Sequence, residues 1–400
     1  MNNETRKETQ VLPKDVRYVG ADDLTLPLFE NQYPVQPMGV SYNSYLILDE
    51  KVAVMDSVDA RAADEWLVKL AHELDGRRPD YLVISHMEPD HSGSILRLAE
   101  RYPEMQLVGN AKTFTMLRQF FGAKAPTDDR LLEVGEGETL PLGAHTLHFM
   151  LAPMVHWPEV MVAYEETEKI LFSADAFGRF GSLGRTANAP WAPQARRYYY
   201  NIVGKYGAQV QALLKKAAAL EIKTVCPLHG PVLTGGALAE ALRLYDLWSR
   251  WQSESPDDIL LAHASIHGNT ARAAELFKQK LEAKGARVTL CDLTTTEVSY
   301  AVANAFYCGK LVLACSTYDG GLFPPMEEFL SHLQAKGFRD RSVGLMENGS
   351  WAPAAARLMR AKLEEMKDLR VCGTVVSLRS ALSPASEAQI DALTTELCAK

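Results

Sequence analysis

The stretch Ile84-Ser85-His86-Met87-Glu88-Pro89-Asp90-His91-Ser92-Gly93 crowds four residues of metal-ligand type into six positions. These four residues come after an apolar run at 81–85, which is typical of a buried strand. Pro89 and the absence of an apolar period predict a loop at the end of that strand. One histidine with one carboxylate in such a loop is usually a cap or a surface pair, whereas four ligand-type residues together indicate a metal site. They are His86, Glu88, Asp90 and His91.

Three polar residues farther along the chain also follow apolar runs, as side chains at strand ends do. They are His156, Asp175 and His229. Taken singly, each is more often a structural residue than a ligand. Because strand ends can deliver side chains to a shared pocket, these three and the four in the loop are enough to complete two coordination spheres.

The composition excludes several classes of function. The chain has 400 residues, a net charge of −8, 47% hydrophobic residues and 23% charged residues, which is typical of a soluble globular protein of two or three domains. The acidic balance argues against a nucleic-acid-binding surface. No apolar run approaches the about 20 residues that a membrane helix needs.

The chain ends and the cysteines indicate a cellular location. The first ten residues, MNNETRKETQ, are polar, so we expect no signal peptide and a cytoplasmic protein. The cysteines are irregularly spaced and form no C-x-x-C pair, which favours free buried thiols. They are Cys226, Cys291, Cys308, Cys315, Cys372 and Cys398.

The polar stretch 249–258 (SRWQSESPDD) predicts a boundary between domains 1–256 and 257–400. The first part alternates short strands with helical runs, which favours a layered α/β sandwich whose topology the pattern leaves open. Its expected strands are 44–48, 52–56, 81–85, 106–109, 146–151, 160–164 and 169–173, and its expected helices are 60–74, 93–101 and 113–120.

In the second part, five apolar runs alternate with amphipathic helical stretches. This pattern predicts a doubly wound α/β domain with a parallel sheet. The expected strands are 259–264, 287–290, 310–315, 342–346 and 370–377, and the expected helices include 270–284, 325–336 and 354–367.

Three loops of the second part lie at carboxyl ends of its strands, where doubly wound folds bind ligands. They are Ser265-Ile266-His267-Gly268-Asn269-Thr270, Ser316-Thr317-Tyr318-Asp319-Gly320-Gly321 and Glu347-Asn348-Gly349-Ser350-Trp351. The first offers hydroxyls and a helix N-terminus to a phosphate, although a plain capping turn would look similar. The other two bring aromatic rings that can stack on a planar ligand, or they are surface turns with incidental aromatics.

Taken together, the seven ligand-type residues resemble the pattern of the metallo-β-lactamase fold, and specifically that of the flavodiiron proteins (A-type flavoproteins) in their two-domain form without a fused rubredoxin. The hydrolytic branch of that fold has histidine where this chain has Glu88, and a carboxylate there shifts the preference from zinc toward iron. The resemblance implies that His86, Glu88 and His156 hold one iron, that Asp90, His91 and His229 hold the other, and that Asp175 bridges them.

The part from about Asp257 onward resembles flavodoxin, which implies FMN bound by the three loops. The expected fold is therefore a metallo-β-lactamase-like αββα sandwich followed by a flavodoxin-like doubly wound parallel sheet. One stretch departs from the family: its N-terminal F-H-G segment corresponds here to Phe29-Glu30-Asn31-Gln32-Tyr33-Pro34. The run Tyr198-Tyr199-Tyr200 is a candidate source of a pocket tyrosine.

The resemblance implies an oxidoreductase that reduces dioxygen to water, nitric oxide to nitrous oxide, or both. It also implies a head-to-tail homodimer or a homotetramer built from such dimers. With no C-x-x-C pair and an end at Lys400, the chain would take electrons from an external donor, a rubredoxin or reduced coenzyme F420. Two other functions stay open at this point: a zinc hydrolase with an accessory domain, and a flavodoxin-type electron carrier with an inert first domain.

Overall fold

The computed structural model describes residues 12–399, so the polar segment on which the signal-peptide argument rests lies outside the described residues. The contacts divide the chain into two units. One comprises Met1–Tyr199 with Ala208–Asp246, and the other comprises Tyr200–Gly207 with Leu247–Lys400.

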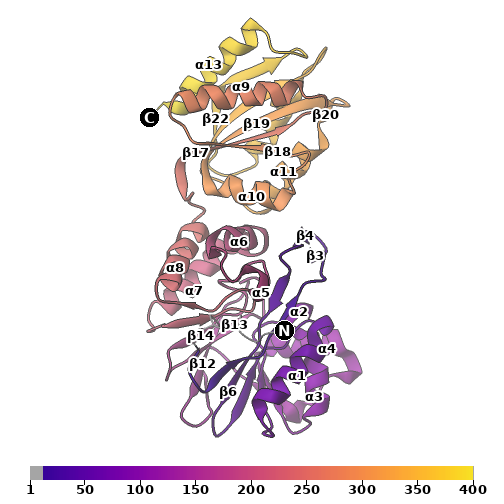
Figure 1. Cartoon of the computed structure of the whole chain (residues 1–400), viewed down its shortest axis with the longest axis vertical. Helices are drawn as coiled ribbons and strands as arrows, with labels where there is room; N and C mark the ends of the chain where they lie inside the picture. The colour runs from indigo at the N-terminus through magenta and orange to yellow at the C-terminus, as the bar shows by residue number, and fades with distance from the viewer. Residues whose placement is uncertain (1–11, 400) are drawn as a thin grey trace, which may run out of the picture. The chain divides into compact units, whose positions relative to one another are not determined.

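Two six-stranded sheets form the centre of the first unit (Figure 1). The first sheet runs in the order β1 (Val16–Tyr18), β6 (Tyr45–Leu48), β7 (Val52–Met55), β8 (Tyr81–Val83), β9 (Gln106–Gly109) and β10 (Leu131–Glu133). The second runs in the order β11 (Thr139–Pro141), β12 (Thr146–Leu151), β13 (Met161–Glu165), β14 (Ile170–Phe172), β15 (Thr224–Cys226) and β16 (Leu233–Thr234). Two short ribbons pair β2 (Ala21–Asp23) with β5 (Val40–Tyr42) and β3 (Leu28–Phe29) with β4 (Tyr33–Pro34).

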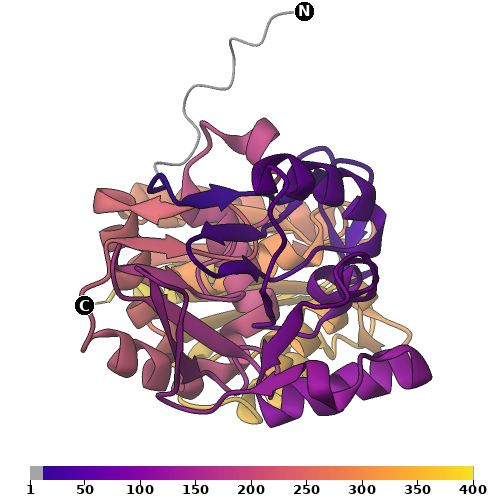
Figure 2. The same ribbon diagram turned by 90° about the horizontal axis from the view of Figure 1, so that it is seen from below.

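Helices flank the two sheets of the first unit on both sides (Figures 1 and 2). On one side lie α1 (Ala63–Leu74), α3 (Ile95–Arg101) and α4 (Ala111–Phe121), and on the other lie α7 (Gly207–Ala217) and α8 (Gly235–Ser249). The inward faces of both sheets share one apolar core, to which Ile47, Val83, Phe149 and Phe172 belong. This four-layer arrangement buries both sheets, and it explains why their strands read as apolar runs.

The stretch 86–93 differs from the loop predicted for it. Pro89–Ser92 forms a short helix, α2, with Pro89 at its first position. A proline there removes no helical hydrogen bond, and its fixed φ suits a helix start, so the residue that suggested a loop begins a helical turn instead. The peptide N–H groups of His91 and Ser92 both donate to the carbonyl oxygen of Glu88, which closes this turn.

The second unit is a parallel five-stranded sheet in the order β18 (Val288–Asp292), β17 (Ser255–Ala264), β19 (Cys308–Tyr318), β21 (Ser342–Asn348) and β22 (Arg370–Leu378), with β20 (Gly321–Leu322) paired to β19. Its helices are α9 (Asn269–Ala283), α10 (Val298–Tyr307), α11 (Pro324–Ala335), α12 (Ala355–Glu364) and α13 (Pro384–Cys398). If the five strands are numbered by their order in the chain, their order across the sheet is 2-1-3-4-5, which is the flavodoxin-like doubly wound order.

Two features of this unit were not expected from the sequence. Strand β17 begins at Ser255, inside the stretch predicted as a linker. The short segment Tyr200–Gly207 also packs in this unit: the ring of Tyr200 stacks on that of Phe306, with centroids 4.0 Å apart and planes 12° apart.

The free thiols predicted from the cysteine spacing are confirmed, because all six cysteines are unpaired and only Cys398 is not fully buried. Among the described residues, no helix combines the length and the apolar character needed to cross a membrane.

Candidate functional site

All seven ligand-type residues of the first unit follow carboxyl ends of strands. Strand β8 leads to the stretch from His86 to His91, β12 to His156, β14 to Asp175 and β15 to His229. Strands β14 and β15 are parallel, and two antiparallel steps give β12 the same direction. The ends of these three strands therefore meet at one edge of the second sheet, which is the physical reason why residues so distant in sequence come together.

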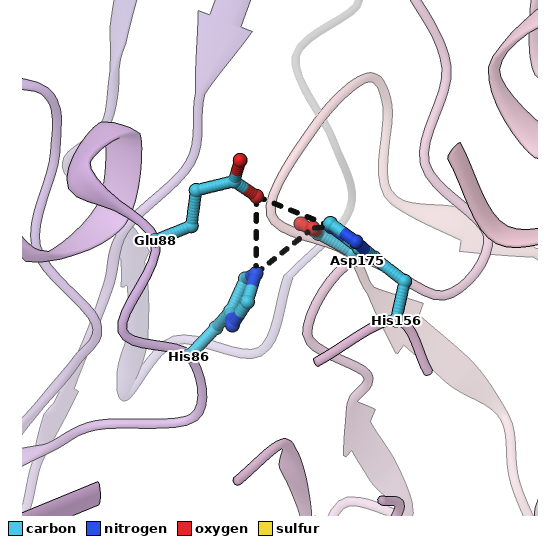
Figure 3. A group of neighbouring side chains, drawn as sticks. All are labelled: His86, Glu88, His156 and Asp175. Carbon is cyan, nitrogen blue, oxygen red and sulfur yellow. Dashed lines mark hydrogen bonds and ion pairs between the residues drawn. The ribbon is translucent and has the colours of Figure 1, made fainter. Parts of the chain in front are cut away.

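The first cluster contains His86, Glu88, His156 and Asp175, with one ligand atom of each within 4.8 Å of the others (Figure 3). Oε2 of Glu88 lies 3.3 Å from Nε2 of His86 and 3.1 Å from Nε2 of His156. Oδ2 of Asp175 lies 3.1 Å from Nε2 of His156 and 3.5 Å from Nε2 of His86. Two imidazoles and two carboxylates thus point their lone pairs at one small volume.

The second cluster contains Asp90, His91 and His229. Oδ2 of Asp90 lies 3.3 Å from the Nε2 atoms of both histidines. Those two Nε2 atoms lie 3.1 Å from one another. Two imidazole nitrogens this close are either a donor and an acceptor or two ligands of one ion.

Asp175 faces both clusters. Its Oδ2 belongs to the first cluster, while its Oδ1 lies 3.2 Å from Nε2 of His91 and 3.6 Å from Nε2 of His229. One carboxylate that offers a different oxygen to each group is the geometry of a bridging ligand.

The electrostatics of the site favour charged side chains despite deep burial. Burial lowers the pKa of His86, but its hydrogen bonds to Glu159 and Glu88 outweigh that effect and raise the pKa well above the usual value. Burial likewise lowers the pKa of His156, yet Asp175 and Glu88 raise it to about 9. Burial raises the pKa of Asp175, but the neighbouring His91 and His156 hold it well below its usual range. The imidazoles and carboxylates thus favour one another's charged forms, and a metal cation in the same place would balance the same carboxylates.

Unsatisfied polar atoms test whether a metal fits these residues. Among the described residues, neither oxygen of Asp90 nor Oδ1 of Asp175 has a hydrogen bond of normal geometry, and their nearest polar neighbours are the Nε2 atoms of His91 and His229 at 3.2–3.6 Å. Buried carboxylate oxygens without a donor are costly, and a cation is what removes that cost. The donor set, imidazole with carboxylate and no thiolate, suits iron or zinc, and the extra carboxylate favours the harder iron.

An aromatic wall stands beside His229. The ring centroid of Phe29 lies 5.3 Å from that of His229, and the centroid of Tyr198 lies 5.6 Å from it. Phe180 packs against both, with centroid distances of 5.5 Å to Phe29 and 5.2 Å to Tyr198. Gly178 makes room for this wall, since a Cβ there would lie 3.3 Å from the Tyr198 ring.

Of the tyrosine run 198–200, Tyr198 is the one next to His229 of the second cluster. Its buried hydroxyl has no hydrogen-bond partner among the described residues. Burial, together with Asp175 and Asp90, raises its pKa well above the usual value, so it stays protonated. The sequence offered three equivalent tyrosines. Tyr198 ends α6 (Trp191–Tyr198), whereas Tyr199 and Tyr200 begin a π-helical turn and pack against Tyr245 and Phe306 instead.

The three loops of the second unit also come together. Thr270 Oγ1 lies 2.9 Å from Ser316 Oγ, and Asn348 Nδ2 donates to Thr270 Oγ1 at 3.2 Å. Gly268 caps α9 with φ 86° and no side-chain bond, so it leaves the first-turn N–H groups to a ligand such as phosphate. The first loop also contains Ser265, Ile266, His267 and Asn269, of which Ser265 Oγ accepts from the Gly268 N–H at 3.1 Å.

The other two loops present aromatic rings to solvent. Asp319 and Gly320 turn the chain between β19 and β20, beside Tyr318, which is 44% exposed. Gly349, Ser350 and Trp351 follow β21, and Trp351 is 87% exposed. Thr317 does not face outward in this way, because its Oγ1 accepts from the Ala354 and Ala355 N–H groups at the start of α12.

Comparison with known proteins covers both units. The model of the ODP family beta lactamase matches residues 40–230. A putative diflavin flavoprotein A 1 from Nostoc is 30% identical over 82% of this chain and 56% of its own length. The rubredoxin-oxygen oxidoreductase of Megalodesulfovibrio gigas is 26% identical over 87% of both chains, and the anaerobic nitric oxide reductase flavorubredoxin of Vibrio vulnificus is 26% identical over 88% of this chain and 72% of its own. The chain belongs to the flavodiiron (A-type flavoprotein) family.

The fold agrees with that of the family over both units. The flavodiiron protein of Giardia intestinalis superposes with a TM-score of 0.88 over 98% of this chain and 95% of its own, at 24% identity. The predicted metallo-β-lactamase-like sandwich followed by a flavodoxin-like sheet is confirmed. The chain spans only about half the length of the Nostoc relative.

Proposed function

We propose that this chain is an oxidoreductase that reduces dioxygen, nitric oxide or both at a diiron site supplied with electrons by FMN. The observation that carries the proposal is the pair of clusters joined by Asp175, with a glutamate, Glu88, in the first. In the proposed site, His86, Glu88 and His156 would hold one iron, Asp90, His91 and His229 would hold the other, and Asp175 would offer one oxygen to each. When bound, the irons supply redox-active sites for a diatomic molecule, and FMN supplies two-electron storage.

The chain's own residues also prepare the surroundings of the metals. Phe29, from the stretch that corresponds to the family's F-H-G segment, and Phe180 form an apolar wall next to His229. Tyr198 keeps its proton and has no protein partner, so we infer that its hydroxyl donates a hydrogen bond to the bound substrate.

The proposed FMN site is built from the three loops of the second unit. Thr270, Ser316 and the N-terminus of α9 would bind the phosphate. Tyr318 and Trp351 would stack on the flavin ring. Their exposure supports this role, because an exposed aromatic ring is available to a planar ligand. The remaining loop residues, including Asn348, would shape the site through the hydrogen bonds described above.

Partners and assembly belong to the same proposal. The electron donor is a rubredoxin or a similar external protein, and the relative named rubredoxin-oxygen oxidoreductase supports this choice over reduced coenzyme F420. The active form is a head-to-tail homodimer in which one subunit's FMN serves the other's metals. Its location is the cytoplasm, for which the six free thiols are the support.

Parallel oxygen and nitric oxide electrode assays test the function. Anaerobically purified protein with reduced FMN should consume at least one of the two gases. Asp90→Ala should abolish this consumption while the protein still contains FMN, because Asp90 lies in the first unit. Asp22→Ala is the matched control: the Asp22 carboxylate accepts from the Leu183 and Gly184 N–H groups, outside both clusters. Unchanged gas consumption in Asp90→Ala would favour an electron carrier instead.

A further inference from the structure

We propose that Glu159 is a positioning residue that fixes the tautomer and the orientation of His86, and that it strengthens metal binding at the first cluster only. This inference rests on the proposed function, because it presumes that the cluster holds a metal ion. Glu159 itself lies outside both clusters and is not a candidate ligand.

The contact between Glu159 and His86 is short and fully enclosed. Glu159 Oε1 lies 2.7 Å from Nδ1 of His86, and both side chains are buried completely. The same oxygen accepts the N–H of Met87 at 2.9 Å. A carboxylate held by two donors on one oxygen has a defined direction, and so has the imidazole that it contacts.

This contact decides which imidazole nitrogen faces the metal position. The Glu159 carboxylate accepts a hydrogen bond, so Nδ1 of His86 carries the proton and donates it. Nε2, which contacts Glu88 and Asp175 at 3.3 and 3.5 Å, is then the nitrogen that can bind a metal ion in place of a proton. The ring of Trp157 also packs against the imidazole of His86 in a T-shaped arrangement, with centroids 5.2 Å apart and planes at 88°. A carboxylate behind a ligating histidine also raises the basicity of that ligand.

The loop that carries Glu159 supports two ligands at once. His156 is three residues before Glu159, so one loop supplies an imidazole directly and orients a second through its carboxylate. Two hydrogen bonds hold the loop in place. Asn110 Nδ2 donates to the carbonyl oxygen of Glu159 at 2.6 Å. The N–H of Met161, just after the loop, donates to the carbonyl oxygen of Ser85 at 3.1 Å.

The second cluster has a different kind of support. Nδ1 of His229 donates to the carbonyl oxygen of Ser41 at 2.7 Å, which is a neutral acceptor. A histidine backed by a carbonyl is a weaker base than one backed by a carboxylate. The two metal positions therefore differ in the basicity of their histidine ligands. Loss of Glu159 should weaken metal binding at the first cluster only.

The chain contains a matched control on β13, the strand that follows the loop of Glu159. Glu165, at the end of β13, lies 3.0 Å from Nδ1 of His145, and this pair is also buried. Glu165 also accepts from the N–H groups of Thr167 and Glu168, so it resembles Glu159 in its bonds but lies away from the clusters. Glu165→Gln thus removes a buried carboxylate from a histidine without touching a ligand.

The test titrates metal-free protein with Co²⁺ by calorimetry and follows proton NMR of the Co²⁺-loaded protein in water. Removing a carboxylate behind a metal ligand usually weakens metal binding about 10-fold to 100-fold. We expect metal affinity to fall by nearer 10-fold in Glu159→Gln, which keeps an acceptor oxygen, and by nearer 100-fold in Glu159→Leu. In both variants only one of the two metal sites should be weakened. The shifted, slowly exchanging Nδ1–H resonance of His86 should exchange faster in both, and Glu165→Gln should match wild type in all respects.

The outcomes separate this proposal from the proposed function. Wild-type affinity at both sites in Glu159→Gln and Glu159→Leu would overturn the role of Glu159 alone. Wild-type protein that binds no pair of ions would overturn the proposed function and this inference with it. If Glu159→Leu does not fold, the affinity and the exchange rate of Glu159→Gln decide.

Discussion

The two units place their candidate sites at opposite extremes of burial. In the first unit, His86, His91 and Asp175 are at most 1% exposed, and their charges balance one another inside the protein. In the second unit, Trp351 and Tyr318 lie exposed on loops, and the N-terminus of α9 has no side-chain cap. A metal centre needs its ligands fixed before the ion arrives, whereas a site for a large planar cofactor can leave its contact surfaces to be covered by the cofactor.

The largest expected effect is the loss of both metal ions from Asp175→Ala, since this carboxylate faces both clusters. His156→Ala and His229→Ala should each weaken only one position. Metal analysis after dialysis measures the difference. Asp23→Ala is the control, because Asp23 is a buried carboxylate that accepts hydrogen bonds from Thr25 and Leu26 instead. Retention of one full equivalent of metal by Asp175→Ala would argue against a bridging role.

The next effect concerns how far the second unit depends on a segment distant in sequence. Tyr200 stacks on Phe306 inside that unit. Replacing a buried aromatic residue with alanine costs about 3–5 kcal/mol, so Tyr200→Ala should lower the stability of the second unit by that order. Calorimetric unfolding measures it, and Tyr200→Phe should retain most of the stability. For the same reason, a fragment of residues 257–400 should be less stable than the unit in the full chain.

A smaller effect is expected at the exposed aromatics. Trp351→Ala should weaken FMN binding by about 1 kcal/mol, which is less than tenfold, because one stacking contact is lost. Fluorescence titration of the FMN-free protein measures this. Phe120→Ala removes an exposed aromatic of the first unit, which is 46% exposed, and should leave FMN affinity unchanged. Equal affinities in wild type and Trp351→Ala would place the flavin ring elsewhere.

The smallest effect is a pH dependence of stability in the second unit. Burial lowers the pKa of His263, while Asp292 and Glu275 oppose this only in part. The unfolded chain therefore binds a proton more readily than the folded one. Stability should fall as the pH drops below about 6.5, the usual histidine value, toward the lower folded pKa. Urea unfolding at pH 7.5 and pH 5.5 measures the free energy of unfolding. Between these pH values it should decrease less for His263→Gln than for wild type or for His267→Gln.

The sequence predicted most of the strands because buried strands are apolar runs, which is a local signal. The four histidines and three carboxylates could be singled out for a related reason: each lies in a segment that follows such a run. The helical turn of Pro89–Ser92 was missed because proline marks both loops and helix starts. Glu159 was missed as well, since a single glutamate after His-Trp-Pro looks like a surface residue.

Other features depend on contacts that no local pattern encodes. Tyr200 and Phe306 are more than 100 residues apart, so nothing near Tyr200 indicates that it packs in the second unit. The choice of Tyr198 over its two neighbours depends on which of the three rings lies next to His229. Which oxygen of Asp175 faces which cluster is likewise a matter of three-dimensional geometry.

The most direct test of the central claim is metal and flavin analysis of anaerobically purified wild-type protein, followed by addition of dioxygen or nitric oxide to the reduced protein. We expect two iron ions and one FMN for each chain, with both cofactors oxidised by at least one of the gases. Zinc without iron, in protein that hydrolyses ester or amide substrates and consumes neither gas, would contradict it.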